Sequence, residues 1–198
     1  MRHNPYFKDK GIVMANPGEK HTYVRERLKK VLSGEELDEI ERDYDHLIDL
    51  GFESVENGEY TKAYDLFVTN MQVSGSSPDA VNGLAISLAE LGETEKAFEV
   101  MKYAVKLYPD DSITIANLAS VYWDMRDYEK AVYYYNKSIE MNPDLADSYF
   151  NLVNVYYESG DVLMAYLASC TLMQKYPDDE QARTMQNDIL LDMAISLS

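Results

Sequence analysis

Apolar residues recur at helical spacing near both ends of the chain. Near its start, Val24, Leu28 and Val31 share one face of a predicted helix over 20–32, and basic residues lie elsewhere on it. We interpret this helix as one that packs against the rest of the chain, because apolar stripes usually face a core. Near its end, the segment 179–197 predicts another helix through five apolar positions: Ala182, Met185, Ile189, Met193 and Leu197.

A capping box begins the next predicted helix. Ser33 is followed three residues later by Glu36, so each side chain can bond to the backbone amide of the other. Apolar residues then continue at steps of three and four: Leu37, Ile40, Tyr44, Leu47 and Gly51. We therefore predict one unbroken helix that runs to about Glu56.

Residues of the same kind recur at a fixed interval through the rest of the chain. Ala63, Ala97, Ala131 and Ala165 are each 34 residues apart. Pro109, Pro143 and Pro177 share the interval, and Gly58, Gly92 and Gly160 share another phase of it, with a double step before Gly160. A period of this length indicates helix-turn-helix repeats. With proline in the thirty-second place, the predicted units are 44–77, 78–111, 112–145 and 146–179.

The residue types at these positions suit paired helices. An alanine permits two helices to cross closely, so we expect the four alanines at the crossing points. An acidic residue precedes each second helix and suits the positive end of the helix dipole, with Asp127 and Asp161 also able to cap the helix through their side chains. The prolines come after the second helices because proline disfavours helix in the residue before it.

The repeats resemble those of the tetratricopeptide repeat family. The third unit matches the family pattern at Ile115, Leu118, Ala119, Tyr122, Ala131, Tyr135, Ser138 and Pro143. The second unit matches it at Val81, Leu84, Ala85, Leu88, Ala97, Met101, Ala104 and Pro109, whereas the first and fourth units depart from it at some places. The resemblance implies an all-α fold, a right-handed α-solenoid of helix-turn-helix repeats.

We divide the chain into four parts. They are a flexible basic N-terminal arm (1–19), an N-terminal helical segment (20–43), four repeats (44–179) and a C-terminal capping helix (180–198). Leu190, Leu191 and Ile195 lie off the main stripe of the last helix, so this end of the array is less polar than a good cap. A second subunit, further chain or the N-terminal helix could cover them, and a homo-oligomer formed through the terminal helices stays open.

Charge and composition exclude several partner classes. The net charge of −17 and the pI near 4.4 argue against nucleic-acid binding, which needs clustered Lys and Arg. Residues 1–32 differ from the rest, with eight Lys and Arg against three acids. A single cysteine cannot form an internal disulfide, and no apolar run has the length of a signal peptide or a membrane span. We therefore expect a cytoplasmic protein without a membrane partner.

No chemistry-bearing motif is evident. His3, His21 and His46 are scattered, so we expect no metal site. Cys170 is interpreted as a small buried hydrophobe and not as a catalytic thiol. Without a phosphate loop or a nucleophile motif, we expect no catalytic or cofactor-binding residues, and hence no enzyme.

The resemblance implies a concave groove lined by the first helices of successive repeats. Asparagine amides both donate and accept hydrogen bonds, so a row of them can hold an extended peptide backbone. The alternative, that Asn117 and Asn151 cap local backbone or face water, stays open. The implied groove residues are Asp49, Phe52, Asn82, Glu90, Asn117, Trp123, Asp124, Phe150, Asn151, Asn154 and Tyr157.

We predict a non-enzymatic scaffold or adaptor that binds a peptide segment of a partner protein. An acidic groove edged by aromatics favours a basic segment with an apolar anchor, and Trp123 is the candidate contact for that anchor. Residues 20–32 themselves fit this description, so an autoinhibitory or dimer-swapped arm is a further hypothesis. The alternative function is a dedicated chaperone similar to the class II chaperones of type III secretion.

Overall fold

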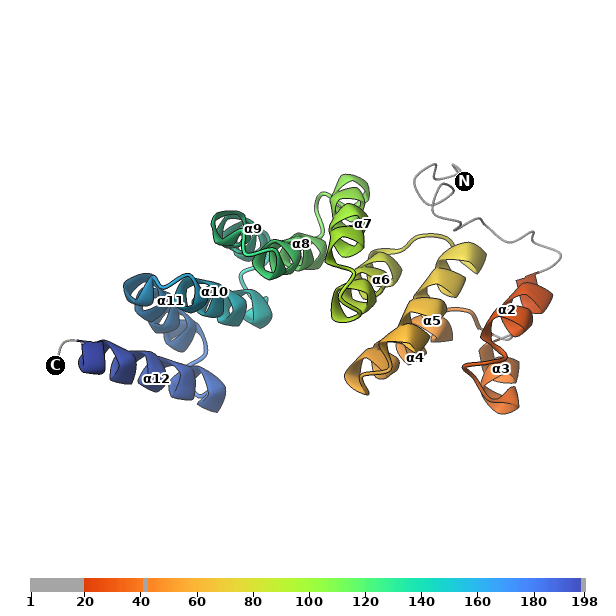
Figure 1. Ribbon diagram of the computed structural model, residues 1–198, viewed down its shortest axis with the longest axis horizontal. Helices are drawn as coiled ribbons and strands as arrows, with labels where there is room; N and C mark the ends of the chain where they lie inside the picture. The colour runs from red at the N-terminus through yellow and green to blue at the C-terminus, as the bar shows by residue number, and fades with distance from the viewer. Residues whose placement is uncertain (1–19, 41–42, 197–198) are drawn as a thin grey trace. The chain divides into compact units, whose positions relative to one another are not determined.

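The structure, a computed structural model, describes residues 20–40 and 43–196 (Figure 1). These residues form eleven α-helices and no strand, which confirms the prediction of an all-α fold. The predicted arm (1–19) lies outside the described residues. The helices form two compact units, Met1–Tyr108 and Pro109–Ser198.

The described part of the first unit holds six helices. They are α2 (Lys20–Leu28), α3 (Gly34–Ile40), α4 (His46–Glu56), α5 (Tyr60–Val73), α6 (Pro78–Glu90) and α7 (Thr94–Leu107). Consecutive helices from α4 to α7 pack against one another, and α4 also contacts α6. The fully buried ring of Phe67 on α5 lies against Gly51 of α4 and Gly83 of α6, where the absence of a side chain leaves room for it.

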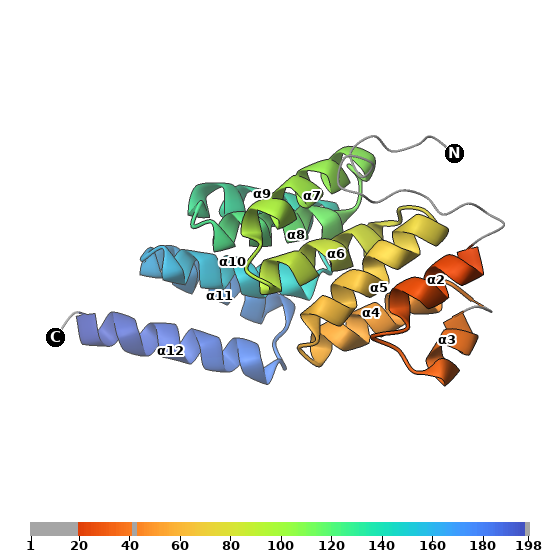
Figure 2. The same ribbon diagram turned by 45° about the vertical axis from the view of Figure 1, so that its right-hand side comes forward.

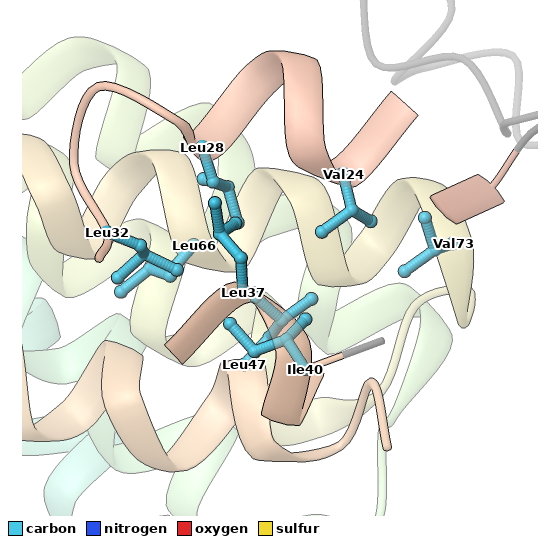
Figure 3. Close-up of a cluster of buried hydrophobic side chains, with 8 residues drawn as sticks. All are labelled: Val24, Leu28, Leu32, Leu37, Ile40, Leu47, Leu66 and Val73. Carbon is cyan, nitrogen blue, oxygen red and sulfur yellow. The ribbon is translucent and has the colours of Figure 1, made fainter. Parts of the chain in front are cut away.

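Helix α2 lies along α5 (Figure 2). Val24 and Leu28 are fully buried in a cluster that also includes residues of α3, α4 and α5 (Figure 3). Polar contacts follow the same interface: Arg27 pairs with Asp65 at 3.1 Å, Tyr23 donates to the Gln72 side chain, and Lys20 donates to the Val73 carbonyl. Since early residues of α2 meet late residues of α5, the two helices run antiparallel.

The packing of α2 differs from two sequence predictions. The helix ends at Leu28 and not near Leu32, because the chain turns there and buries Leu32 in the same cluster. The hypothesis that residues 20–32 occupy a groove formed by first helices is not what the structure shows. The apolar face of α2 is instead buried against α5 in the same unit.

The predicted unbroken helix to Glu56 is wrong, because α3 ends at Ile40 and α4 begins at His46. The Asp43 carboxylate accepts from the Asp45 amide at 2.9 Å. When a short polar side chain bonds to a nearby backbone amide, the backbone gains an alternative to helical hydrogen bonds. Ile40 and Leu47 enter one buried cluster from two separate helices, so their helical spacing was misleading.

The capping box at the start of α3 is confirmed. The Glu36 amide donates to Ser33 Oγ at 3.2 Å, and the Ser33 amide donates to Glu36 Oε2 at 2.6 Å. The bond to the Ser33 hydroxyl, followed by the bond to its amide, lowers the pKa of Glu36. These bonds satisfy two amides that the first turn of a helix leaves without intrahelical partners.

Replacing Ser33 by alanine is expected to lower the free energy of unfolding by about 1 kcal/mol, since the hydroxyl acceptor at the helix start is lost. Urea denaturation followed by circular dichroism measures the change. Ser76→Ala, an exposed serine outside any helix, is the control and should leave the midpoint unchanged. Equal stability of the two variants would contradict a stabilising cap at Ser33.

The described part of the second unit holds five helices. They are α8 (Ser112–Asp124), α9 (Tyr128–Met141), α10 (Ala146–Glu158), α11 (Val162–Lys175) and α12 (Glu180–Ser196). Each helix packs against the next, and α8 also contacts α10. Helix α12 closes a cluster in which Ala182 and Ile189 join Val153 of α10 and Ala165 of α11.

Several predicted local features are present across both units. The alanines at positions 63, 97, 131 and 165 are all fully buried. Asp127 and Asp161 accept from backbone amides three residues on and cap α9 and α11, as predicted. Gly58, Gly92 and Gly160 have positive φ in the turns between helices. Each of the helix pairs α4–α5, α6–α7, α8–α9 and α10–α11 falls inside one predicted repeat, and the repeat boundaries themselves stay a prediction.

Candidate peptide-binding surface

The first unit places four of the predicted groove residues in different surroundings. Asp49 is exposed on α4, and Phe52 is half-buried with its ring edge-on to Phe67 at 5.1 Å. Glu90 accepts a hydrogen bond from the Tyr60 hydroxyl, which raises the pKa of Tyr60. Asn82 is only 3% exposed, because α6 packs against α4, α5 and α7 at once. Asn82 therefore belongs to the core and does not offer its amide to a ligand.

The second unit brings four predicted residues together. Asn117 of α8 and Phe150, Asn151 and Asn154 of α10 line one hollow of 330 Å³, which we call the asparagine hollow. Asp147 and Gln181 also line it. Three asparagine amides and one aromatic ring thus line a common space. The sequence predicted such a group of asparagines for binding a peptide backbone.

The three asparagines differ in their hydrogen bonds. Asn151 bonds to the Tyr135 hydroxyl, which also lies 2.7 Å from Ser120 Oγ. Burial raises the pKa of Tyr135, so this phenol stays neutral and keeps Asn151 oriented. The amides of Asn117 and Asn154 form no hydrogen bond within residues 43–196. These two side chains are therefore the ones available to a ligand.

Two aromatic residues are held by neighbouring acids. The Trp123 indole N–H donates to Glu158 Oε2 at 2.8 Å, and its ring packs half-buried against the core of α8, α9 and α10. Thirty-four residues on, the Tyr157 hydroxyl donates to Asp192 on α12. Trp123 therefore links α8 to α10 and does not line the asparagine hollow, and its role as an anchor stays a prediction. Asp124, beside it, is exposed at the end of α8.

A second hollow of 660 Å³ lies between α10 and α12, and we call it the acidic hollow. Asn154 and Tyr157 line its α10 side, and Glu180 and Asp188 line its α12 side. Met185 supplies apolar surface, and the buried Val153 and Ile189 lie beneath it. Because Asn154 and Gln181 line both hollows, the two form adjoining parts of one surface.

Sequence reasoning missed the α12 residues of this surface because we interpreted that helix only as a cap. The 34-residue interval contained the necessary signal. Four residues of the asparagine hollow have counterparts on α12 that lie 34 positions later in the sequence; the four are Asp147, Phe150, Asn151 and Asn154. Their counterparts are Gln181, Thr184, Met185 and Asp188, and all four counterparts line the acidic hollow. Helix α12 thus takes the place of a further first helix.

The repeated helix pairs and the first-helix surface define a helical repeat protein. Models of the tetratricopeptide repeat match residues 83–111, 113–145 and 134–166. These three matches support a tetratricopeptide repeat protein. A fold of this family supports a role as a protein–protein interaction scaffold.

Solved structures with the same fold agree with this assignment. A thermophilic tetratricopeptide repeat protein of Thermus thermophilus superposes with a TM-score of 0.68 at 20% identity, over 76% of this chain and 82% of that one. The tetratricopeptide repeat domain of Sgt2 from Aspergillus fumigatus superposes with a TM-score of 0.54 at 25% identity, over 60% of this chain and 80% of that one. The Cut9–Hcn1 hetero-tetramer of the APC/C gives 0.65 at 16% identity, over 74% of this chain and 30% of that one. Comparison with curated proteins gave no match.

Neither a membrane span nor a metal-binding group is present among the described residues. Across 20–40 and 43–196, no helix combines the length and the apolar character needed to cross a bilayer. Within the same residues, no three His, Cys, Asp or Glu side chains are grouped so that they could hold a metal ion. The cytoplasmic location stays a prediction.

Proposed function

We propose that this protein is a non-enzymatic scaffold whose second unit holds an extended segment of a partner protein across α8 and α10. The observation that carries the proposal is the asparagine hollow, where Asn117 and Asn154 present amides that have no partner within residues 43–196. One amide can accept from a peptide N–H and donate to a peptide C=O, whatever the side chains of that peptide are. Phe150 adds an aromatic surface beside them.

The charge of the second unit favours a basic partner segment. Residues 109–198 contain 15 Asp and Glu against five Lys and Arg. A surface of one sign attracts segments of the opposite sign and rejects those of its own. The partner is therefore a protein segment that carries Lys or Arg together with an apolar side chain for Phe150. Neither nucleic acid nor a membrane surface fits this charge.

A peptide-display library tests the proposal. Random dodecapeptides are selected on the full-length protein, and the affinity of the enriched peptides is then measured by fluorescence anisotropy. The Asn117→Ala, Asn154→Ala double variant should bind them about tenfold or more weakly, since each lost hydrogen bond contributes about 0.5–1.5 kcal/mol. Neither side chain is bonded within the described part of the chain, so the variant should fold normally.

The matched control is Asn187→Ala, an exposed asparagine of α12 that lines neither hollow. This variant should keep wild-type affinity. Equal affinity of the double variant and the wild type would refute binding in the asparagine hollow. A selection that enriches no peptide would refute the scaffold proposal in this form.

A further inference from the structure

The acidic hollow between α10 and α12 combines an apolar floor with acidic walls. Val153 is fully buried and Ile189 is 2% exposed, so both form floor, whereas Glu180 and Asp188 are exposed at its sides. Its lining includes no Lys or Arg. Within residues 43–196 neither carboxylate has a basic partner, and Arg183 of the same helix donates instead to the Pro177 carbonyl.

The charge at one side of this hollow affects Tyr157. The hydrogen bond to Asp192 raises the pKa of Tyr157, and the negative charges of Asp192 and Asp188 raise it further. Tyr157 itself is 42% exposed, so part of its ring is accessible from the hollow. The ring face of a tyrosine attracts a cation, and so do the carboxylates of Glu180 and Asp188 that line the hollow.

We propose that the acidic hollow is a specificity site that binds the side chain of a Lys or Arg in the partner segment. This inference rests on the proposed function, because the asparagine hollow would hold the backbone of that same segment. Asn154 and Gln181 border both hollows, so a segment that leaves one enters the other. Helix α12 then contributes to recognition as well as closing the stack.

The shape of a basic side chain fits the chemistry of this hollow. Lys and Arg lay their methylene stems along apolar surface and keep the charged end among polar groups. Here the stem would lie on Met185, above the buried Val153 and Ile189, and the charged end would lie beside Glu180 or Asp188. An acidic side chain would meet like charges, and a purely apolar one would leave both carboxylates without a partner.

The peptides selected on the wild-type protein also test this inference. We expect them to share a Lys or Arg at one position, and replacing that residue by glutamine should weaken binding to the wild type about tenfold. The Glu180→Gln, Asp188→Asn double variant should bind the basic and the glutamine peptides alike. A matched control, Glu140→Gln with Asp178→Asn, removes the same charge at exposed sites outside both hollows and should keep the tenfold preference.

The outcomes separate the two proposals. Peptides that depend on Asn117 and Asn154 but share no basic residue would overturn the specificity site and leave the scaffold standing. A basic preference that survives in the Glu180→Gln, Asp188→Asn variant would also overturn it, because the cation would then bind elsewhere. Peptides that bind independently of Asn117 and Asn154 would refute the scaffold proposal instead.

Discussion

Replacing Leu28 by alanine is expected to lower the free energy of unfolding of the first unit by about 2–5 kcal/mol. Leu28 is fully buried and lies in the cluster that joins α2 to α3, α4 and α5 (Figure 3). The truncated side chain would lose apolar burial and leave a cavity, which the surrounding helices fill only in part. Urea denaturation followed by circular dichroism measures the loss.

The control for this variant is Leu191→Ala, the same truncation at a residue of α12 that is 60% exposed. Its stability should stay within about 0.5 kcal/mol of the wild type, as is usual for surface substitutions. Hydrogen exchange gives a second measurement, because detachment of α2 would expose Gln72 and Val73 of α5. Leu28→Ala with the stability and exchange of the control would show that α2 contributes nothing to the first unit.

Replacing Gly83 by alanine is expected to lower the free energy of unfolding by about 1–3 kcal/mol, through overpacking. A Cβ at this position would lie 2.2 Å from Cζ of Phe67 and 2.4 Å from Cε1. Atoms cannot approach so closely, and Phe67 is fully buried, with Gly51 against the same ring. The ring or helix α6 must therefore move, and denaturation by urea reports the cost.

Gly34→Ala is the matched control, because a Cβ there has no neighbouring atom within 4 Å. It should be neutral or slightly stabilising, as alanine restricts the unfolded chain more than glycine does. A double-mutant cycle with Phe67→Leu identifies the cause: the smaller side chain should reduce the penalty of Gly83→Ala. An unchanged penalty in the Phe67→Leu background would show that the clash with the ring is not its source.

Several positions of α12 are polar where the preceding first helix, α10, contributes residues to the core. Tyr149, Leu152 and Val153 of α10 contribute to the buried clusters of the second unit. Their counterparts 34 residues on are Arg183, Gln186 and Asn187. A helix with polar residues at these positions has little apolar surface for a further second helix, which agrees with the capping role that the sequence predicts; that role stays a prediction. Leu190 and Leu191 remain exposed beyond this region, and self-association through them stays a prediction.

The sequence predicted the helices well wherever the determinants are local. The capping box of Ser33 and Glu36 and the caps at Asp127 and Asp161 depend on residues three positions apart. The break between α3 and α4 was missed, because Ile40 and Leu47 keep helical spacing although they reach the core from different helices. A periodic pattern reports which residues are buried and not whether one helix carries them.

The candidate site was only partly predictable for the same reason. A groove place in the repeat does not specify exposure. Asn82 and Asn117 occupy adjacent places that the family resemblance assigns to the groove, yet Asn82 is buried and Asn117 lines a hollow. Trp123 could not be identified as a link between helices, since its partner Glu158 lies 35 residues away.

The sequence by itself determined that this chain is a series of helix pairs, because helix starts and ends are set by residues close together in the sequence. Only the tertiary structure decided which of the predicted site residues are buried, which are bonded to other side chains and which line a hollow. It buried Asn82, tied Trp123 to Glu158, packed α2 on α5, and brought Glu180 and Asp188 of α12 beside Asn154. These outcomes depend on which surfaces meet when residues far apart in the sequence come together.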